Sequence, residues 1–286
     1  EQIPYRQYVE HGMKDAFHTT ANKSNVPVIF INDKRLTLRA QRMDGLLSKL
    51  FRNVMKFDAI APGHPFYQSN ISVLQAKYSA QSEKVLAIFL SHQGAIRMAL
   101  DVCQEKNASF AVIMEDDVSF DFLVLWRHDT FDDIIKRAPK DWNLVQLGHT
   151  SLVEHPVHGT IPQYISPVKP GFVNGGHYGA FAYMISVLGM KKILGRSIAE
   201  VKEVCPYLTA DDCLLPFTPS LTLRKYHPLF NSTYVLVPPI FGVNIDFSST
   251  HRSGMEARDS WLAAASGQCV SLFQNSWIFN HERDAN

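Results

Sequence analysis

Apolar residues along the chain follow two patterns, short continuous runs and longer stretches with helical spacing. The runs at 26–31 and 110–114 are rich in Val, Ile and Phe and are bounded by polar residues, which is typical of buried strands. Leu36–Phe51 and Glu83–Glu105 instead place their apolar residues on one helical face. This succession of strands and helices predicts an α/β fold.

The same pattern continues to about residue 245. Pro and Gly are frequent in 157–176, which predicts a loop. Further strands are expected at 142–147, 180–186 and 234–237, and further helices at 131–138 and 189–194. We therefore expect one domain over residues 26–245, preceded by a polar arm or stem at 1–25 and followed by an arm or lid at 246–286.

The composition is that of a folded globular chain. Of the 286 residues, 46% are hydrophobic, and 28 Lys and Arg nearly balance 27 Asp and Glu. The apolar content excludes a mainly disordered chain, and the balanced charge gives no reason to expect nucleic acid as a partner. The longest apolar run, Val85–Leu90, is far shorter than the about 20 residues that span a bilayer. Membrane attachment is therefore expected only through a segment absent from this chain, and the oligomeric state is left open.

Cysteines and glycosylation sequons bear on the compartment. The four cysteines show neither a C-x-x-C pair nor zinc-ligand spacing, so a structural zinc site is not expected. Four N-x-S/T sequons begin at Asn22, Asn70, Asn107 and Asn231, against roughly 1.5 expected by chance. We therefore expect the secretory-pathway lumen, in the endoplasmic reticulum or Golgi, with a type II membrane anchor in the full-length protein as one arrangement. The cytoplasm is the alternative.

Three consecutive carboxylates, Glu115, Asp116 and Asp117, follow the second apolar run. Ligands of open α/β sheets bind beyond the carboxyl ends of the strands. If the strand geometry continues, Glu115 and Asp117 point to one side and Asp116 to the other. Such a pair can hold a hard divalent cation together with water and substrate phosphates. The alternative is a solvated acidic turn.

A second carboxylate pair, Asp211-Asp212, has two interpretations. It is either the N-cap of a helix or a catalytic base at the edge of a cleft. Arg35, Arg39 and Arg42 share one helical face, where they form either an ordinary solvated basic surface or a site for a diphosphate. The chain has no Walker A motif, no G-x-G-x-x-G turn and no G-x-S-x-G elbow.

Taken in order, these segments resemble glycosyltransferase family 25, which includes lipooligosaccharide and procollagen galactosyltransferases. The resemblance covers roughly residues 26–216. Its segments are Val28–Asn32 with Arg35, Arg39 and Arg42; Phe57–Ile60; Leu90–His92; Ile113–Val118; Trp142–Gly148; Ala182–Ser186 with Gly189; and Asp211–Leu214. The chain departs from the family at Asn143, where members usually have Asp, and it matches only loosely after Tyr234.

The resemblance implies a GT-A-like nucleotide-sugar-binding fold with a central mixed, mostly parallel sheet. It implies an inverting glycosyltransferase that moves galactose or glucose from a UDP-sugar to a hydroxyl of a glycan or protein acceptor, with Mn²⁺ or another divalent cation as cofactor. The expected nucleotide-binding residues are Asn32, Arg35, Arg39, Ser91, His92, Glu115 and Asp116.

The resemblance also suggests metal ligands and a base. Asp117 is the first candidate ligand, Glu115 is a second ligand or a partner of the ribose, and His251 is a further candidate ligand. Inversion needs a carboxylate that takes the proton of the acceptor hydroxyl. Asp211 is the first choice for this base and Asp212 the second, followed by Asp246 or His251 in the tail.

Two other functions remain open at this stage. One is a catalytically silent relative that binds a glycan or a partner protein, and the other is a metal-dependent phosphohydrolase that uses both acidic clusters.

Overall fold

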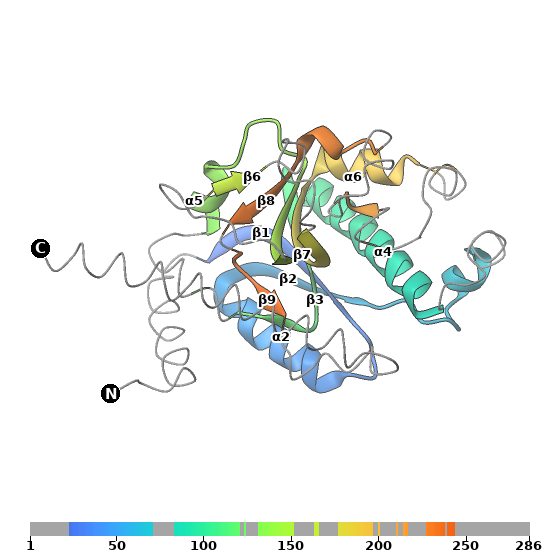
Figure 1. Ribbon diagram of the computed structural model, residues 1–286. Coiled ribbons are helices and arrows are strands. Elements are labelled where there is room, and N and C mark those ends of the chain that lie inside the picture. Colours follow the sequence, from blue (N-terminus) through green and yellow to red (C-terminus); the bar gives the residue numbers. More distant parts are fainter. Residues whose placement is uncertain are drawn as a thin grey trace, which may run out of the picture.

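The computed structural model describes most of the predicted domain (Figure 1). The described residues are 23–70, 83–120, 123, 131–151, 163–165, 177–196, 200, 210, 214–216, 227–237 and 239–243. Of the predicted arm at 1–25 only residues 23–25 are described, and the segment 246–286 lies outside the described residues.

A seven-stranded mixed sheet forms the centre of the molecule, in the order β2-β1-β3-β7-β5-β8-β6. Strands β2, β1, β3, β5 and β8 run in one direction, and β7 and β6 run against them. This is the mixed, mostly parallel sheet that was expected, and it is compatible with a GT-A-like fold. The strands are β1 (Ser24–Asn32), β2 (Phe51–Asp58), β3 (Phe110–Glu115), β5 (Leu144–Ser151), β6 (Gln163–Ile165), β7 (His177–Ser186) and β8 (Thr233–Val237).

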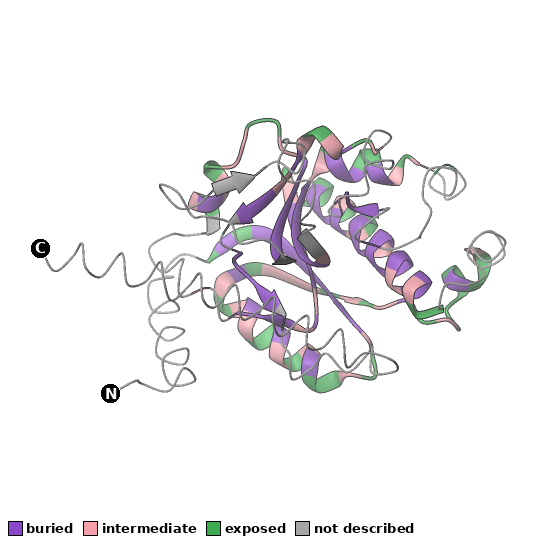
Figure 2. Ribbon diagram, viewed as in Figure 1, coloured by how far each residue is buried: buried purple, intermediate pink, exposed green. Residues whose placement is uncertain are grey.

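Helices cover both faces of the sheet, so that the domain has three layers (Figures 1 and 2). Alternate residues of β1 face opposite ways: Val28 and Phe30 pack under α2 (Thr37–Leu50), and Ile29 and Ile31 pack under α4 (Glu83–Glu105). Helix α6 (Val187–Leu194) joins α4 on its face. Burying an aliphatic side chain of this kind is worth about 1.5–3 kcal/mol, so this two-sided core accounts for the apolar runs in the sequence.

Helix α4 has the bounds that its apolar period predicted. By length and composition it is the one helix among the described residues that could cross a membrane. Its apolar side chains, Leu86, Phe89, Leu90 and Ile96 among them, are buried against the sheet. Helix α4 is therefore a core helix in this fold.

Two strands of the seven-stranded sheet were not predicted. Strand β2 lies at the sheet edge and exposes Arg52 and Lys56 among its apolar residues, so it lacks a continuous apolar run. Its first residue, Phe51, was expected to end the preceding helix. The short β6 falls inside 157–176, which was expected to be a loop. The predicted helix at 131–138 is α5 (Phe131–Lys136).

A second, two-stranded sheet begins directly after the acidic residues. Strand β4 (Val118–Ser119) pairs antiparallel with β9 (Gly242–Val243). In addition, Phe241 forms a parallel bridge to Gly148 in β5. These pairings hold the chain at 241–243 beside the carboxyl end of β3, where the candidate site lies.

Candidate functional site

The carboxyl end of β3 divides its acidic residues between the two faces of the sheet. In a strand, successive side chains point to opposite faces. Ile113 packs on the α4 face, and Glu115, two residues further, contacts His92 of α4. Met114 packs on the α2 face, and Asp116, two residues further, contacts Arg39 of α2. The strand period alone therefore gives neighbouring carboxylates different partners, as the sequence predicted for Glu115 and Asp116.

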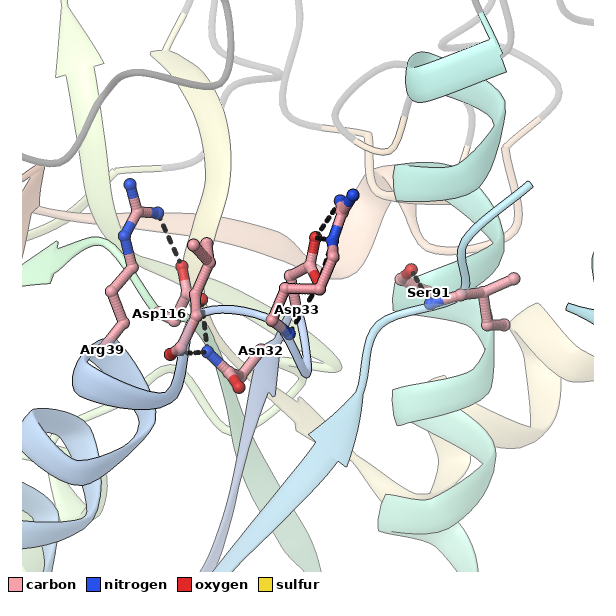
Figure 3. Close-up of polar contacts among 8 residues, drawn as sticks. Asn32, Asp33, Arg39, Ser91 and Asp116 are labelled. Atoms are coloured by element: carbon pink, nitrogen blue, oxygen red, sulfur yellow. Dashed lines mark hydrogen bonds and ion pairs between the residues drawn. The ribbon is translucent and has the colours of Figure 1, made fainter. Parts of the chain in front are cut away.

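Asp116 is the centre of a buried polar link between β1, β3 and α2 (Figure 3). Asn32 Nδ2 donates to Asp116 Oδ2 at 2.6 Å, and Arg39 donates to Oδ1 at 3.1 Å. Asn32 stands level with Asp116 because Ile31 pairs with Glu115 in the parallel register. Burial raises the pKa of Asp116, and the hydrogen bonds from Asn32 and Arg39 oppose that rise. Because Asn32 and Arg39 are tied to this carboxylate, they hold the loop after β1 to the end of β3.

The three arginines do not form one common surface. Arg39 is buried against Asp116, and Arg42 donates to the carbonyl oxygen of Val118 at 3.2 Å. Arg35 is different: its side chain is 79% exposed and pairs with Asp33. The idea of an ordinary solvated face is therefore wrong for Arg39. Arg35 is the arginine of the three that is exposed near the carboxyl end of β1.

Arg39→Ala is expected to lower the stability of the fold strongly, and Arg35→Ala is expected to lower it hardly at all. Removing the partner of a buried ion pair leaves an uncompensated charge, which costs about 3–5 kcal/mol, so Arg39→Ala should lower the melting temperature strongly. Arg35→Ala should leave stability nearly unchanged, because the guanidinium is exposed and exposed ion pairs contribute little. Thermal denaturation of the two variants measures this contrast. Equal melting temperatures would mean that the Arg39–Asp116 link does not support the fold.

On the other face of the sheet, Glu115 belongs to a second hydrogen-bonded group. His92 Nε2 lies 3.1 Å from Glu115 Oε1, and His92 Nδ1 lies 3.1 Å from the hydroxyl of Tyr183 in β7. The side chains of His92 and Tyr183 are buried, and that of Glu115 is 31% exposed. Glu115 is thus the member of this group that reaches solvent.

Ser91 has a structural role in this geometry (Figure 3). Its hydroxyl accepts from the backbone N–H of Ile60 at 2.8 Å and donates to the carbonyl oxygen of Ala87 at 2.7 Å. Like its neighbour His92, Ser91 is buried. Ser91 and His92 were expected to line the nucleotide cleft. In the structure both polar side chains lie beneath the surface, so we infer that they act by holding other groups.

Asp117 is the least compensated carboxylate at the site. Its Oδ1 is buried and has no hydrogen-bond partner. Burial, followed by the charges of Glu115 and Asp116, raises the pKa of Asp117 to about 7, although Arg39 acts in the opposite direction. A buried oxygen without a partner is costly unless a ligand satisfies it. Among the described carboxylates, Asp117 is therefore the one that most needs an external cation or donor group.

The described carboxylates supply part of the ligand set of a hard divalent cation. Carboxylate oxygens suit Mg²⁺ and similar ions, which commonly take one or two protein carboxylates and complete their shell with water and phosphate oxygens. Glu115 and Asp117 come from one strand end. Within the described ranges, no three His, Cys, Asp or Glu side chains gather as a complete metal site. A cation here would need a substrate or residues beyond those ranges, where His251 lies.

The candidate bases Asp211 and Asp212 also lie outside the described residues. Their described neighbours, Ala210, Leu214 and Leu215, are buried in the core beneath α4. The backbone N–H of Leu215 donates to the carbonyl oxygen of Ala210 at 2.9 Å. The chain is thus anchored on both sides of the pair, on the sheet face to which Glu115 belongs.

Asn143, at which the chain departs from family 25, lies at the other end of the sheet. It accepts from Ser186 Oγ at 2.8 Å and donates to Ser232 Oγ at 2.9 Å. A Cβ on Gly189 would lie 2.6 Å from the carbonyl oxygen of Asn143. Asn143 is level with Phe110, five residues before Glu115, which is roughly 16 Å along the strand. The departure therefore does not touch the acidic site.

Sequence reasoning missed one residue of the site. Tyr183 was recognised only as part of an apolar strand, yet its hydroxyl completes the group formed by His92 and Glu115. A tyrosine in a strand that is otherwise apolar was the available signal, because a buried hydroxyl usually has a partner. The identity of that partner depended on the pairing of β3 with β7.

Comparison with known proteins adds one finding to this geometry. The chain is similar to two procollagen galactosyltransferases. Both are from Xenopus laevis: procollagen galactosyltransferase 1-A is 27% identical over 181 residues and 1-B is 26% identical over the same length. Each alignment covers 58% of this chain but 28% of the relative, so the chain spans well under half the length of the relatives. No protein-family model matches the chain. The similarity supports a glycosyltransferase at the general level.

Proposed function

We propose that this protein is an inverting, metal-dependent glycosyltransferase that moves a hexose, galactose or glucose, from a UDP-sugar to an acceptor hydroxyl on a glycan or protein. The observation that supports this proposal most is the unpartnered carboxylate oxygen of Asp117 at the carboxyl end of β3. It lies in a chain that is similar to galactosyltransferases. The divalent cation that accompanies a sugar diphosphate would supply positive charge beside this oxygen.

The proposal gives each side chain a physical task. Asp117 and Glu115 would hold the cation, which as a Lewis acid offsets the charge of the departing diphosphate. Arg35 has an exposed guanidinium that can leave Asp33 and form paired bonds to phosphate oxygens. The loop between β1 and α2 would be held to the end of β3 by Asn32, Arg39 and Asp116, which would thereby support the site without contacting the nucleotide. The proton of the acceptor hydroxyl would go to Asp211 or Asp212.

A screen of UDP-sugars with and without Mn²⁺ tests this function. A ligand at 100 times its dissociation constant stabilises a folded protein by about 2.7 kcal/mol, so thermal shift detects binding even where turnover is slow. Binding that requires Mn²⁺, followed by sugar transfer, is the expected result. Binding without any transfer would favour the silent relative, and release of phosphate from UDP would favour the phosphohydrolase. Absence of binding to every UDP-sugar would contradict the proposal.

A secretory-pathway lumen, in the endoplasmic reticulum or Golgi, is the compartment that we propose. Among the sequon asparagines that the structure describes, Asn107 is the best presented. It follows the end of α4 with a φ of 52°, a left-handed conformation that Asn tolerates at helix ends, and both Asn107 and Ser109 are exposed. By contrast, the hydroxyl of Thr233 in the Asn231 sequon is buried and donates to the carbonyl oxygen of Leu229.

Expression in a eukaryotic secretory host is expected to add an N-glycan at Asn107. Because this turn lies at the opposite end of β3 from Glu115, a glycan there should leave UDP binding unchanged. Peptide mapping before and after enzymatic deglycosylation measures the occupancy, and Asn107→Gln is the matched control. Recovery of secreted protein with Asn107 unmodified would count against both the site and the compartment.

A further inference from the structure

The group formed by Tyr183, His92 and Glu115 runs from the core to the surface of the site. Tyr183 comes from β7, His92 from the middle of α4 and Glu115 from the end of β3. The side chain of His92 is 1% exposed, whereas that of Glu115 is 31% exposed. A buried histidine with both ring nitrogens engaged is held rigidly, and it can therefore fix the position of the more exposed carboxylate.

The chemistry of the partners determines where the hydrogens lie. A carboxylate oxygen only accepts hydrogen bonds, so His92 Nε2 must carry a hydrogen and donate it to Glu115 Oε1. Burial, and next the charge of Glu115, raise the pKa of Tyr183 well above its ordinary value, so the phenol keeps its proton. The Tyr183 hydroxyl can then donate to Nδ1, which favours the ring tautomer that has its hydrogen on Nε2.

We propose that His92 is a positioning residue of the UDP-sugar site: it holds one oxygen of Glu115 and leaves the other oxygen of that carboxylate for the cation that accompanies UDP. This role rests on the proposed function and assigns His92 no direct contact with the nucleotide. The arrangement matches the way in which hydrogen-bond partners orient metal-ligating groups, and loss of such a partner typically costs about 10–100-fold in metal affinity or activity.

Two substitutions separate positioning from packing. In His92→Gln the amide nitrogen stands near the position of Nε2 and can still donate to Glu115. In His92→Asn the shorter side chain reaches only the position of Nδ1. Isothermal titration with UDP and Mn²⁺ should show a loss of about 10–100-fold for His92→Asn and about threefold or less for His92→Gln. Asn143→Ala is the control, because it removes a buried polar side chain far from the site and should lower stability without changing UDP affinity.

A double-mutant cycle with Glu115→Gln tests whether His92 acts through Glu115. If it does, His92→Asn should change UDP affinity by less than about twofold once Glu115 is already replaced, because the two effects are then not additive. Additive losses, or equal losses in His92→Asn and His92→Gln, would overturn the positioning role. Failure of the wild-type protein to bind UDP at all would instead overturn the proposed function.

A measurement without ligand tests the same contact. In ¹⁵N-histidine NMR spectra of the unliganded chain, His92 should show a slowly exchanging hydrogen on Nε2, and its resonance should move in Glu115→Gln. A hydrogen on Nδ1 alone, or an Nε2 resonance that Glu115→Gln leaves in place, would overturn the positioning role whether or not UDP binds.

Discussion

Asp117→Asn is expected to remove Mn²⁺-dependent UDP binding and, at the same time, to make the unliganded protein more stable at pH 8. The two effects have one cause. Asp117 has a buried oxygen without a partner and lies beside Glu115 and Asp116, so its charge is costly in the absence of a ligand. Asparagine keeps the shape of the side chain but carries no charge. It therefore relieves the repulsion and offers the cation a much weaker ligand.

The pH dependence follows from the direction of the pKa shift. The pKa of Asp117 is raised from the ordinary 3.8 to about 7 in the folded protein. Between these values the folded state binds more protons than the unfolded state, so this residue makes stability fall as pH rises through that window. The difference between Asp117→Asn and wild type should be small near pH 4, grow up to about pH 7 and then remain constant.

Melting temperatures from pH 4 to pH 8 measure this effect. One pKa unit corresponds to about 1.4 kcal/mol, so a gain on the order of 1–4 kcal/mol above pH 7 is expected for Asp117→Asn. At roughly 2–4 °C for each kcal/mol, the rise in melting temperature should be several degrees. Asp101→Asn, at an exposed position of α4, is the matched control and should show no such gain. A lower melting temperature for Asp117→Asn at pH 8 would contradict the assignment.

In the presence of Mn²⁺ and UDP, the wild type should become more stable than Asp117→Asn. Metal binding requires a deprotonated carboxylate, so Mn²⁺ with UDP should stabilise wild type more at pH 8 than at pH 6. The Asp117→Asn variant should gain little at either pH. Equal UDP affinity of the wild type in EDTA and in Mn²⁺ would rule out Asp117 as a metal ligand.

The sequence predicted the strands that are buried on both faces and the long helix whose apolar face packs on the sheet. Strands β1, β3 and β7 and helix α4 have strong apolar patterns, because each must fill a core that lies between two layers. The edge strand β2 escaped prediction because several of its residues are partly or fully exposed, which interrupts the apolar run. The period of apolar residues therefore predicts a strand or helix where its side chains are fully buried, and it fails where they are partly exposed.

The sequence predicted where the candidate site lies, but not which side chains contact one another there. The carboxylates Glu115, Asp116 and Asp117 at a strand end marked the place. Their partners come from residues that are distant in sequence: 84 positions separate Asn32 from Asp116, and 91 separate His92 from Tyr183. The strand order β1-β3-β7 and the packing of α4 on one face of the sheet bring these side chains together. Helical spacing likewise predicted one surface for Arg35 and Arg39, although Arg39 is buried in an ion pair with Asp116.

Asp211→Asn and Asp212→Asn are expected to have very unequal effects on sugar transfer. An inverting reaction needs one carboxylate to accept the proton of the acceptor hydroxyl, and an amide cannot accept it. General-base catalysis typically contributes about 10²–10⁴-fold, so the variant that lacks the base should lose transfer by that factor and keep its affinity for UDP. Two adjacent side chains cannot both point into one cleft in the same way, so the second variant should lose little.

Rates of transfer, UDP affinity and melting temperature, measured together, test the base assignment. The buried residues on both sides, Ala210 and Leu214, provide a control for folding: Leu214→Ala should lower the melting temperature by removing a core side chain. A variant that melts like the wild type and binds UDP normally has therefore lost chemistry and not structure. If both Asn variants transfer sugar at nearly the normal rate, the base lies elsewhere, with Asp246 or His251 as the next candidates. If both lose UDP binding, the pair belongs to the sugar-donor site, because a general base for the acceptor has no contact with the nucleotide.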